Sequence, residues 1–413
     1  MNIICERDIL NAAVTPAMSA VSNKGTVQTL DGFLLIADKD EGTLVICGYD
    51  LEKGVKVTLS GEGVEINESG RIVLNAAKFS SVIKNLPEGD VYISSDSEFA
   101  VNISSGKSEF ILHGLDAEGF PLMPELAGEK SLKIPRKILK NMIGSTLFSV
   151  GVNNARPVLN GALFEIKNNR LTVVGTDSYR LSLRRSFEGL SSDEELDLSF
   201  IIPGKSLGEL LKLIGDGDEA AEIELTRKHV IISFDNIIFF SRLIESEFLD
   251  YMRAIKAVEP RTTVIVNTQR FLESVERAAV LSDDKQRTEV RLNFKKEEIN
   301  IENKEEAGVL QVSSFGSMGK VNDEFDIEIY GDDLLIAFNH RYLFESLRAV
   351  RDEKIVIKLE STMKSLIILP YLNDKNDKEN KDNEEKNGDN NIYNMDTDGS
   401  RFLYLVLPIR MRD

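Results

Sequence analysis

LTVVGTDSYRLSL, residues Leu171–Leu183, combines two alternating apolar runs with a polar corner at residues 175–178. Glycine and aspartate tolerate positive φ, and threonine and serine bond to nearby backbone, so the run predicts two strands joined by a tight reversal. The same pattern surrounds Gly48, 127 residues before Gly175, and Asn303, 128 residues after it. One structural unit is therefore predicted to occur three times in this chain.

Two helical patterns keep the same order in each unit. The aligned residues of the first pattern are Leu10, Leu139 and Leu272, at intervals of 129 and 133 residues. Those of the second are Phe79, Leu207 and Leu343, at intervals of 128 and 136. Polar, proline-containing segments separate the units, and the expected domains are residues 1–128, 129–258 and 259–413.

Each unit is predicted to run strand, helix, strands, helix, hairpin, which is an α+β pattern. In the first unit we expect Asp8 to cap a helix that ends by Val21 and is kinked or shortened by Pro16. The closing hairpin of the third unit is interrupted by residues 373–400, where nine acids accompany four lysines. This acidic insertion has too few apolar residues to bury and is predicted to be a disordered hairpin tip.

The charge distribution decides whether nucleic acid is a reasonable partner. A net charge of −18 opposes it at first, because phosphate binding requires lysine and arginine. However, the six predicted helical segments sum to +6, which leaves −18 − 6 = −24 on the rest of the chain. These segments are residues 6–20, 75–85, 135–149, 203–214, 267–281 and 339–350. The pattern indicates a basic surface within an acidic body, with ordinary solvated helix faces as the alternative.

Composition narrows the class of protein further. A hydrophobic fraction of 42% without any run of 18 apolar residues is typical of a globular protein with no membrane span. Charges close to the start argue against a signal peptide, and Cys5 and Cys47 lie in apolar runs, so we expect buried free thiols and a cytoplasmic protein. Three histidines and two distant cysteines do not form a zinc pattern, so no metal or cofactor is expected.

Catalytic motifs are absent from the sequence. It contains no P-loop, no GxGxxG after a strand, no HExxH and no GxSxG. The corner at residues 175–178 holds a serine and an aspartate but has no nearby histidine, so a structural corner is the better interpretation. The sequence does not predict an enzyme.

Three runs carry a resemblance to a known family: RPVLNGALFE at Arg156–Glu165, TDSYRL at Thr176–Leu181 and YLVLPIRM at Tyr404–Met411. With the threefold repeat, they resemble the bacterial DNA polymerase III β subunit, the family of replicative sliding clamps. The likeness covers the chain except residues 373–400. It implies three DNA-clamp domains, each with two helices packed on antiparallel sheets. It also implies a head-to-tail homodimer that forms a ring of pseudo-sixfold symmetry.

The resemblance implies a non-catalytic processivity factor. The ring would encircle duplex DNA through weak, sequence-independent phosphate contacts that leave it free to slide. Short linear peptides would tether the DNA polymerase III α subunit, the clamp loader, and other polymerases and repair proteins. No membrane partner is implied. A repeat-built adaptor that gathers proteins without encircling DNA is the alternative.

The resemblance also assigns residues to DNA and to the dimer. DNA contacts would fall on Lys24, Asn153 and Arg156, and the charge pattern adds Lys78, Lys140, Arg277 and Arg348. Simple solvation is the alternative for each lone lysine. Across the dimer interface, Phe110 and Leu112 would meet Val280 and Leu281. Phe110 and Leu112 are two residues apart and should point to one face of a strand.

The partner-peptide site implied by the family consists of Leu159, Thr176, Ser178, Tyr179, Arg180, Leu181, Leu249, Arg253, Ala254, Met363, Ser365, Leu405, Val406, Leu407, Pro408, Ile409, Arg410 and Met411. Its apolar members would anchor a peptide, and its arginines would donate to peptide carbonyls or acids. Core packing is the alternative for the terminal strand. Tyr179 stands where histidine is frequent and Leu249 where proline is common, so peptide preference is expected to differ.

Overall fold

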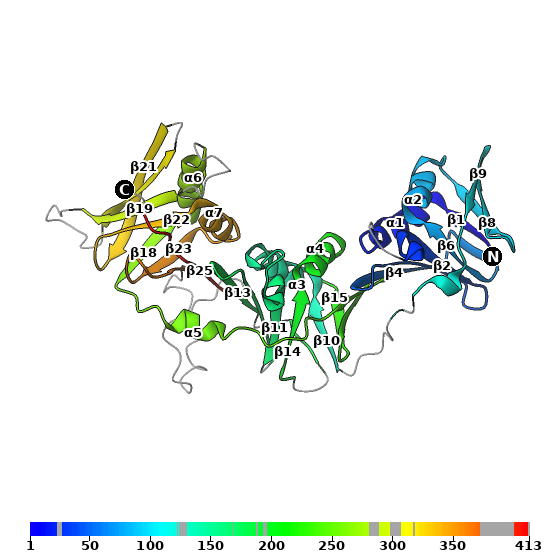
Figure 1. Cartoon of the computed structure of the whole chain (residues 1–413), viewed down its shortest axis with the longest axis horizontal. Helices are drawn as coiled ribbons and strands as arrows, with labels where there is room; N and C mark the ends of the chain where they lie inside the picture. Colours follow the sequence, from blue (N-terminus) through cyan, green and yellow to red (C-terminus); the bar gives the residue numbers. More distant parts are fainter. Residues whose placement is uncertain are drawn as a thin grey trace. The chain divides into compact units, whose positions relative to one another are not determined.

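The computed structural model of the chain is α+β, with short helices and antiparallel strand pairs throughout the part described (Figure 1). It describes residues 1–22, 27–121, 123, 130–167, 169–186, 189–192, 196–280, 289–297, 307–316, 319–371 and 400–411. The chain divides into two compact units. The first consists of Met1–Lys140, residues 191–194 and Lys205–Glu245, and the second consists of Asn141–Leu190, residues 195–204 and Ser246–Asp413.

The first unit contains two antiparallel sheets. The five-stranded sheet has the order β5-β1-β7-β8-β9, and the eight-stranded sheet has the order β10-β15-β16-β17-β4-β3-β2-β6. Their strands are β1 (Asn2–Glu6), β2 (Gly32–Asp38), β3 (Thr43–Tyr49), β4 (Lys53–Ser60), β5 (Val64–Glu68), β6 (Gly70–Asn75), β7 (Asp90–Ser95), β8 (Ala100–Ser105), β9 (Ser108–His113), β10 (Lys130–Pro135), β15 (Ala220–Leu225), β16 (His229–Phe234) and β17 (Ile237–Arg242). Helices α1 (Arg7–Met18) and α2 (Ala76–Asn85) pack against each other.

The second unit is built on one twelve-stranded sheet, with the order β14-β11-β12-β13-β25-β24-β23-β18-β21-β20-β19-β22. Its strands are β11 (Gly161–Lys167), β12 (Arg170–Thr176), β13 (Arg180–Ser186), β14 (Leu198–Pro203), β18 (Thr262–Asn267), β19 (Glu289–Lys296), β20 (Ala307–Gly316), β21 (Gly319–Tyr330), β22 (Leu334–Asn339), β23 (Lys354–Leu359), β24 (Leu366–Pro370) and β25 (Ser400–Val406). Helices α6 (Thr268–Ala279) and α7 (His340–Arg348) pack together, and α5 (Tyr251–Lys256) precedes β18. The remaining α-helices of the described residues are α3 (Arg136–Gly144) and α4 (Gly204–Leu213).

The predicted helix pattern is confirmed at most landmarks. Phe79, Leu207 and Leu343 are fully buried in α2, α4 and α7, as expected of residues on an apolar helix face. The landmark Asn303 lies outside the described residues, and so does the acidic insertion apart from Ser400. The expected hairpin on either side of the insertion is present, because β24 pairs antiparallel with β25.

The expected capping role of Asp8 is wrong. Residue Glu6 occupies the N-cap position of α1 and makes no side-chain cap bond. The Arg7 amide donates to the carbonyl of Gly89 at 3.0 Å, so a neighbouring loop satisfies a helix-start donor that a cap would otherwise bond. Asp8 instead lies in the first turn, and the helix ends at Met18, shortly after Pro16.

The reversal between β12 and β13 is confirmed, but its residues have different roles from those expected. Ser178, not Gly175, adopts the positive φ, at 77°. Asp177 Oδ1 accepts from the amides of Tyr179 and Arg180 at 2.9 and 3.0 Å, which closes the turn. Gly175 lies inside β12, where a Cβ atom would sit 2.7 Å from the carbonyl oxygen of Thr146. The absence of a side chain at Gly175 therefore allows this strand to lie close to the backbone at Thr146.

We expect Gly175→Ala to lower the free energy of unfolding by about 1–3 kcal/mol, because the added methyl group would overlap a backbone oxygen. Thermal unfolding followed by circular dichroism measures the change. Gly144→Ala is the matched control, since a Cβ atom there would meet nothing within 4 Å. Equal stability of the two variants would contradict the packing argument.

Candidate partner-binding surface

The terminal segment of the chain lies against the predicted corner. Strands β13 and β25 pair from Arg180 opposite Val406 to Ser186 opposite Ser400. Beyond this ladder the Leu407 amide donates to the Tyr179 carbonyl at 2.9 Å, and the Ile409 amide donates to a β22 carbonyl at 2.8 Å. The corner and the C-terminal segment, remote in sequence, therefore form one local structure.

Burial divides the predicted partner residues into three groups. Those buried are Leu159, Thr176, Arg180, Leu181, Ser365, Leu405 and Val406. Pro408 and Ile409 are partly buried. Those exposed are Ser178, Tyr179, Leu249, Arg253, Ala254, Met363, Leu407, Arg410 and Met411. We call this exposed group the partner surface. Tyr179, Met363, Leu407 and Met411 are 37–62% exposed, which is high for large apolar side chains.

Arg180 is not an available peptide donor, contrary to the expectation. Its side chain is only 6% exposed, and its guanidinium Nε donates to Asp177 Oδ2 at 3.1 Å. The two remaining nitrogens donate to Glu345 of α7 and to the carbonyl of Phe148. Because these three acceptors lie on separate elements, Arg180 fixes the corner against α7 rather than facing a ligand.

An aromatic pair that sequence reasoning missed lies beside Arg180. The rings of Tyr179 and Tyr342 stack with centroids 5.9 Å apart and an interplanar angle of 21°. The Arg180 guanidinium carbon lies 4.7 Å from the Tyr342 ring centroid, within cation–π range. Burial, and then the charge of Asp177, raise the pKa of Tyr342, so its phenol stays neutral at physiological pH. Only the apolar periodicity of its helix hinted at this position.

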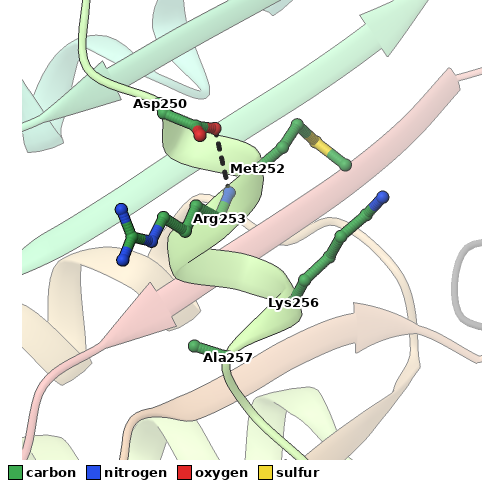
Figure 2. Close-up of a pocket in the computed structure, with 5 residues that line it drawn as sticks. All are labelled: Asp250, Met252, Arg253, Lys256 and Ala257. Atoms are coloured by element: carbon green, nitrogen blue, oxygen red, sulfur yellow. Dashed lines mark hydrogen bonds between the residues drawn. The ribbon is translucent and has the colours of Figure 1, made fainter.

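Helix α5 contributes two residues of the partner surface, Arg253 and Ala254, and it too was missed because six residues give no clear periodicity. Asp250 Oδ1 accepts from the Arg253 amide at 3.1 Å, which caps the helix (Figure 2). A pocket of about 470 Å³ lies along it, lined by Asp250, Met252, Arg253, Lys256 and Ala257. Figure 2 shows Arg253 extending to the opposite side of the helix from Met252 and Lys256.

Some residues expected to contact DNA are exposed, and others are paired with acidic side chains. Asn153 and Arg156 are exposed, and Asn153 has a φ of 53° in the loop before β11. Lys78 and Arg348 are exposed on α2 and α7. In contrast, Lys140 donates to Asp216 at 3.0 Å and Arg277 donates to Asp323, so acidic neighbours reduce their local positive charge. Lys24 lies outside the described residues.

The residues expected at a dimer contact lie at an edge and at a helix end. Strand β9 ends the five-stranded sheet, so one side of its backbone has no partner strand in the described chain. Phe110 and Leu112 lie opposite Ile103 and Val101 of β8 and so share one face, as expected. Sequence reasoning missed Ile111 between them, which is 63% exposed.

Of the two residues expected on the helix side of the dimer contact, the structure describes one. Val280, at the C-cap of α6, is 76% exposed, and Leu281 lies outside the described residues.

Both cysteines lie in the interior of the protein. Cys5 and Cys47 are buried free thiols, as expected, and burial raises the pKa of each to about 12. Among the described residues no three or more His, Cys, Asp or Glu side chains are grouped to hold a metal ion. In the same part of the chain no helix has the length and apolar character needed to cross a membrane.

Comparison with known proteins defines the class. The N-terminal, central and C-terminal domain families of the DNA polymerase III β subunit match residues 1–124, 133–250 and 257–381. The chain is thus a three-domain DNA clamp protein by fold. It belongs to the DNA polymerase III β subunit family, the β sliding clamps.

Individual relatives agree with this assignment. The beta sliding clamp of Halalkalibacterium halodurans is 32% identical over 91% of this chain and 97% of its own length. That of Bacillus subtilis is 31% identical over 89% and 95%. The crystal structure of the B. subtilis DNA polymerase sliding clamp has a TM-score of 0.87 at 29% identity, with both chains fully covered.

We expect Arg180→Ala to lower the free energy of unfolding by about 2–4 kcal/mol, because it removes the buried guanidinium that Asp177, Glu345 and the Phe148 carbonyl share. Arg341→Ala is the matched control, since Arg341 donates to the same Glu345 at 3.0 Å. Its side chain is 70% exposed, and such a pair contributes at most about 1 kcal/mol. Chemical denaturation measures both, and an equal loss would refute the interior role of Arg180.

Proposed function

We propose that this protein is a replicative sliding clamp that encircles duplex DNA and tethers the replicative polymerase to it. Three clamp domains in one chain, each matched by its own β-subunit family, are the observation that carries this proposal. Two chains joined head to tail would place six such domains in a ring. The protein would act by retention alone, as a non-catalytic processivity factor in the bacterial cytoplasm.

The domain limits we propose are residues 1–128, 129–258 and 259–413, with the acidic insertion, of which only Ser400 is described, in the last of them. The family matches at 1–124, 133–250 and 257–381 support these limits. The insertion joins β24 to β25, two strands that pair directly, so extra residues there need not disturb the sheet.

The dimer would form where the free edge of β9 meets the end of α6 in a second chain. An exposed strand edge carrying Phe110, Ile111 and Leu112 invites aggregation unless another chain covers it. Val280 offers an exposed apolar partner, followed in sequence by Leu281. Because these patches differ, the contact would be head to tail, and two such contacts close a ring.

DNA would be held by a few exposed cations rather than by a dense basic groove. Arg156, Lys78 and Arg348 are exposed and would attract phosphates without reading bases, and the family resemblance adds Asn153 and Lys24 to this set. The paired states of Lys140 and Arg277 favour assigning them a weaker role. Weak attraction suits a ring, because retention by topology leaves it free to move along the duplex.

Partner proteins would dock through short linear peptides on the partner surface. Exposed Tyr179, Met363, Leu407 and Met411 offer apolar contact, and Arg253 and Arg410 offer donors. The natural candidates are the DNA polymerase III α subunit and the clamp loader, followed by other polymerases and repair proteins. Tyr179 stacks on Tyr342, so the peptide would meet an aromatic pair at this side of the surface.

Loading the protein onto nicked circular DNA tests the proposal. We expect the loaded protein to stay bound through gel filtration and to be released when a restriction enzyme linearises the circle, because a ring can leave only at an end. Blocking both ends of the linear DNA should restore retention. Equal retention on circular and open linear DNA would rule out encirclement and favour an adaptor.

A further inference from the structure

Helix α5 carries part of the partner surface but is too short to be stable by itself. It has six residues, and isolated helices of this length do not persist in water. Its cap, from Asp250 to the Arg253 amide, is internal to the segment. Contacts with the twelve-stranded sheet must therefore determine where Arg253 lies.

Two consecutive residues attach the first turn of α5 to that sheet. The Tyr251 hydroxyl donates to the Glu165 carboxylate of β11, and Met252 Sδ lies 3.8 Å from Arg185 Nη2 of β13. Glu165 lies opposite Thr172 of β12, which lies opposite Arg185. The two attachment points thus occupy one row across three adjacent strands.

The attachment also fixes the rotation of the helix about its axis. Ile255, one turn after Tyr251, is 2% exposed and packs on the same side. Arg253, Ala254 and Lys256 are exposed. The apolar contact of Ile255 has no direction, whereas the hydrogen bond from Tyr251 is directional, so the hydroxyl selects the orientation that presents Arg253.

The hydrogen bond between Tyr251 and Glu165 is strong and persists at physiological pH. Burial, and then the hydrogen bond to Glu165, raise the pKa of Tyr251, so the hydroxyl keeps its proton throughout the physiological range. The acceptor is a carboxylate, and such charge-assisted hydrogen bonds are stronger than neutral ones.

We propose that Tyr251 and Glu165 are positioning residues of the partner surface, which hold α5 so that Arg253 can donate to a bound peptide. This inference rests on the proposed function, because it assumes that a partner peptide binds there. Because Arg253 is a cationic donor, the partner would be a peptide with an acidic side chain or a free carbonyl near Arg253.

The probe is a fluorescein-labelled peptide from the terminus of a bacterial replicative polymerase, with affinity measured by fluorescence polarisation on the full chain. We expect Tyr251→Phe to weaken binding about three- to tenfold, with an unchanged dimer mass. Glu165→Leu should weaken it similarly, whereas Glu165→Gln, which keeps an acceptor oxygen, should largely restore affinity. Tyr92→Phe, at an exposed tyrosine of β7, is the control and should bind normally.

A double-variant comparison separates positioning from general destabilisation. In an Arg253→Ala background, Tyr251→Phe should cause little further loss, because the residue that it positions is gone. An undiminished effect in that background would overturn the inference. The same holds if Tyr251→Phe and Glu165→Leu bind normally while Arg253→Ala and Met411→Ala bind weakly.

The remaining outcomes are also decisive. If Arg253→Ala and Met411→Ala both bind normally, the partner surface itself is wrongly assigned, and the positioning role falls with it. Should Tyr251→Phe fail to fold, the comparison of Glu165→Leu with Glu165→Gln decides the question, since only the former removes the acceptor.

Discussion

The ladder between β13 and β25 is the constraint on which the rest of the second unit depends. It joins β11–β14 of the central domain to the strands of the last domain in one continuous sheet, from Arg180 opposite Val406 to Ser186 opposite Ser400. A one-residue slip would turn every side chain of β25 to the other face, so Leu403 and Leu405 would replace Phe402 and Tyr404 in the core of the last domain. The same register places Leu407 on the Tyr179 carbonyl and so creates the partner surface. In the first unit, the pairing of β17 with β4 plays the equivalent part between the first and central domains.

This sharing of sheets explains why a threefold sequence repeat appears as two compact units. The central domain contributes β10 and β15–β17 to one sheet and β11–β14 to another, and each set is continuous with a neighbouring domain. One copy of the repeated corner, at residues 175–178 of the central domain, has additional contacts. Among the described residues, the corner of the central domain meets the C-terminal strand, and there the buried Arg180 binds the partly buried Asp177 and Glu345 beside the Tyr179–Tyr342 pair.

Local patterns predicted the repeat, most strands and the long helices, because period and spacing are properties of the sequence itself. The same reasoning failed wherever a long-range contact decides the outcome. Arg180 looks like a surface donor until Glu345, 165 residues away, is seen to accept from it. The sequence presents Lys140 and Arg277 as free charges, but they donate to Asp216 and Asp323, which lie 76 and 46 residues further along the chain. Asp8 does not cap α1, because the carbonyl of Gly89 accepts from the first amide of that helix. Helix α5 is too short to give a periodic pattern in the sequence.

A modest number of exposed cations, an apolar sheet edge and the proposed partner surface together suit a protein that is retained on DNA by closure rather than by affinity. Electron microscopy of the purified protein tests closure most directly. The account predicts closed rings with a central hole, formed by two chains of 46.1 kDa each. Single three-domain particles with the mass of one chain and without any hole would contradict it.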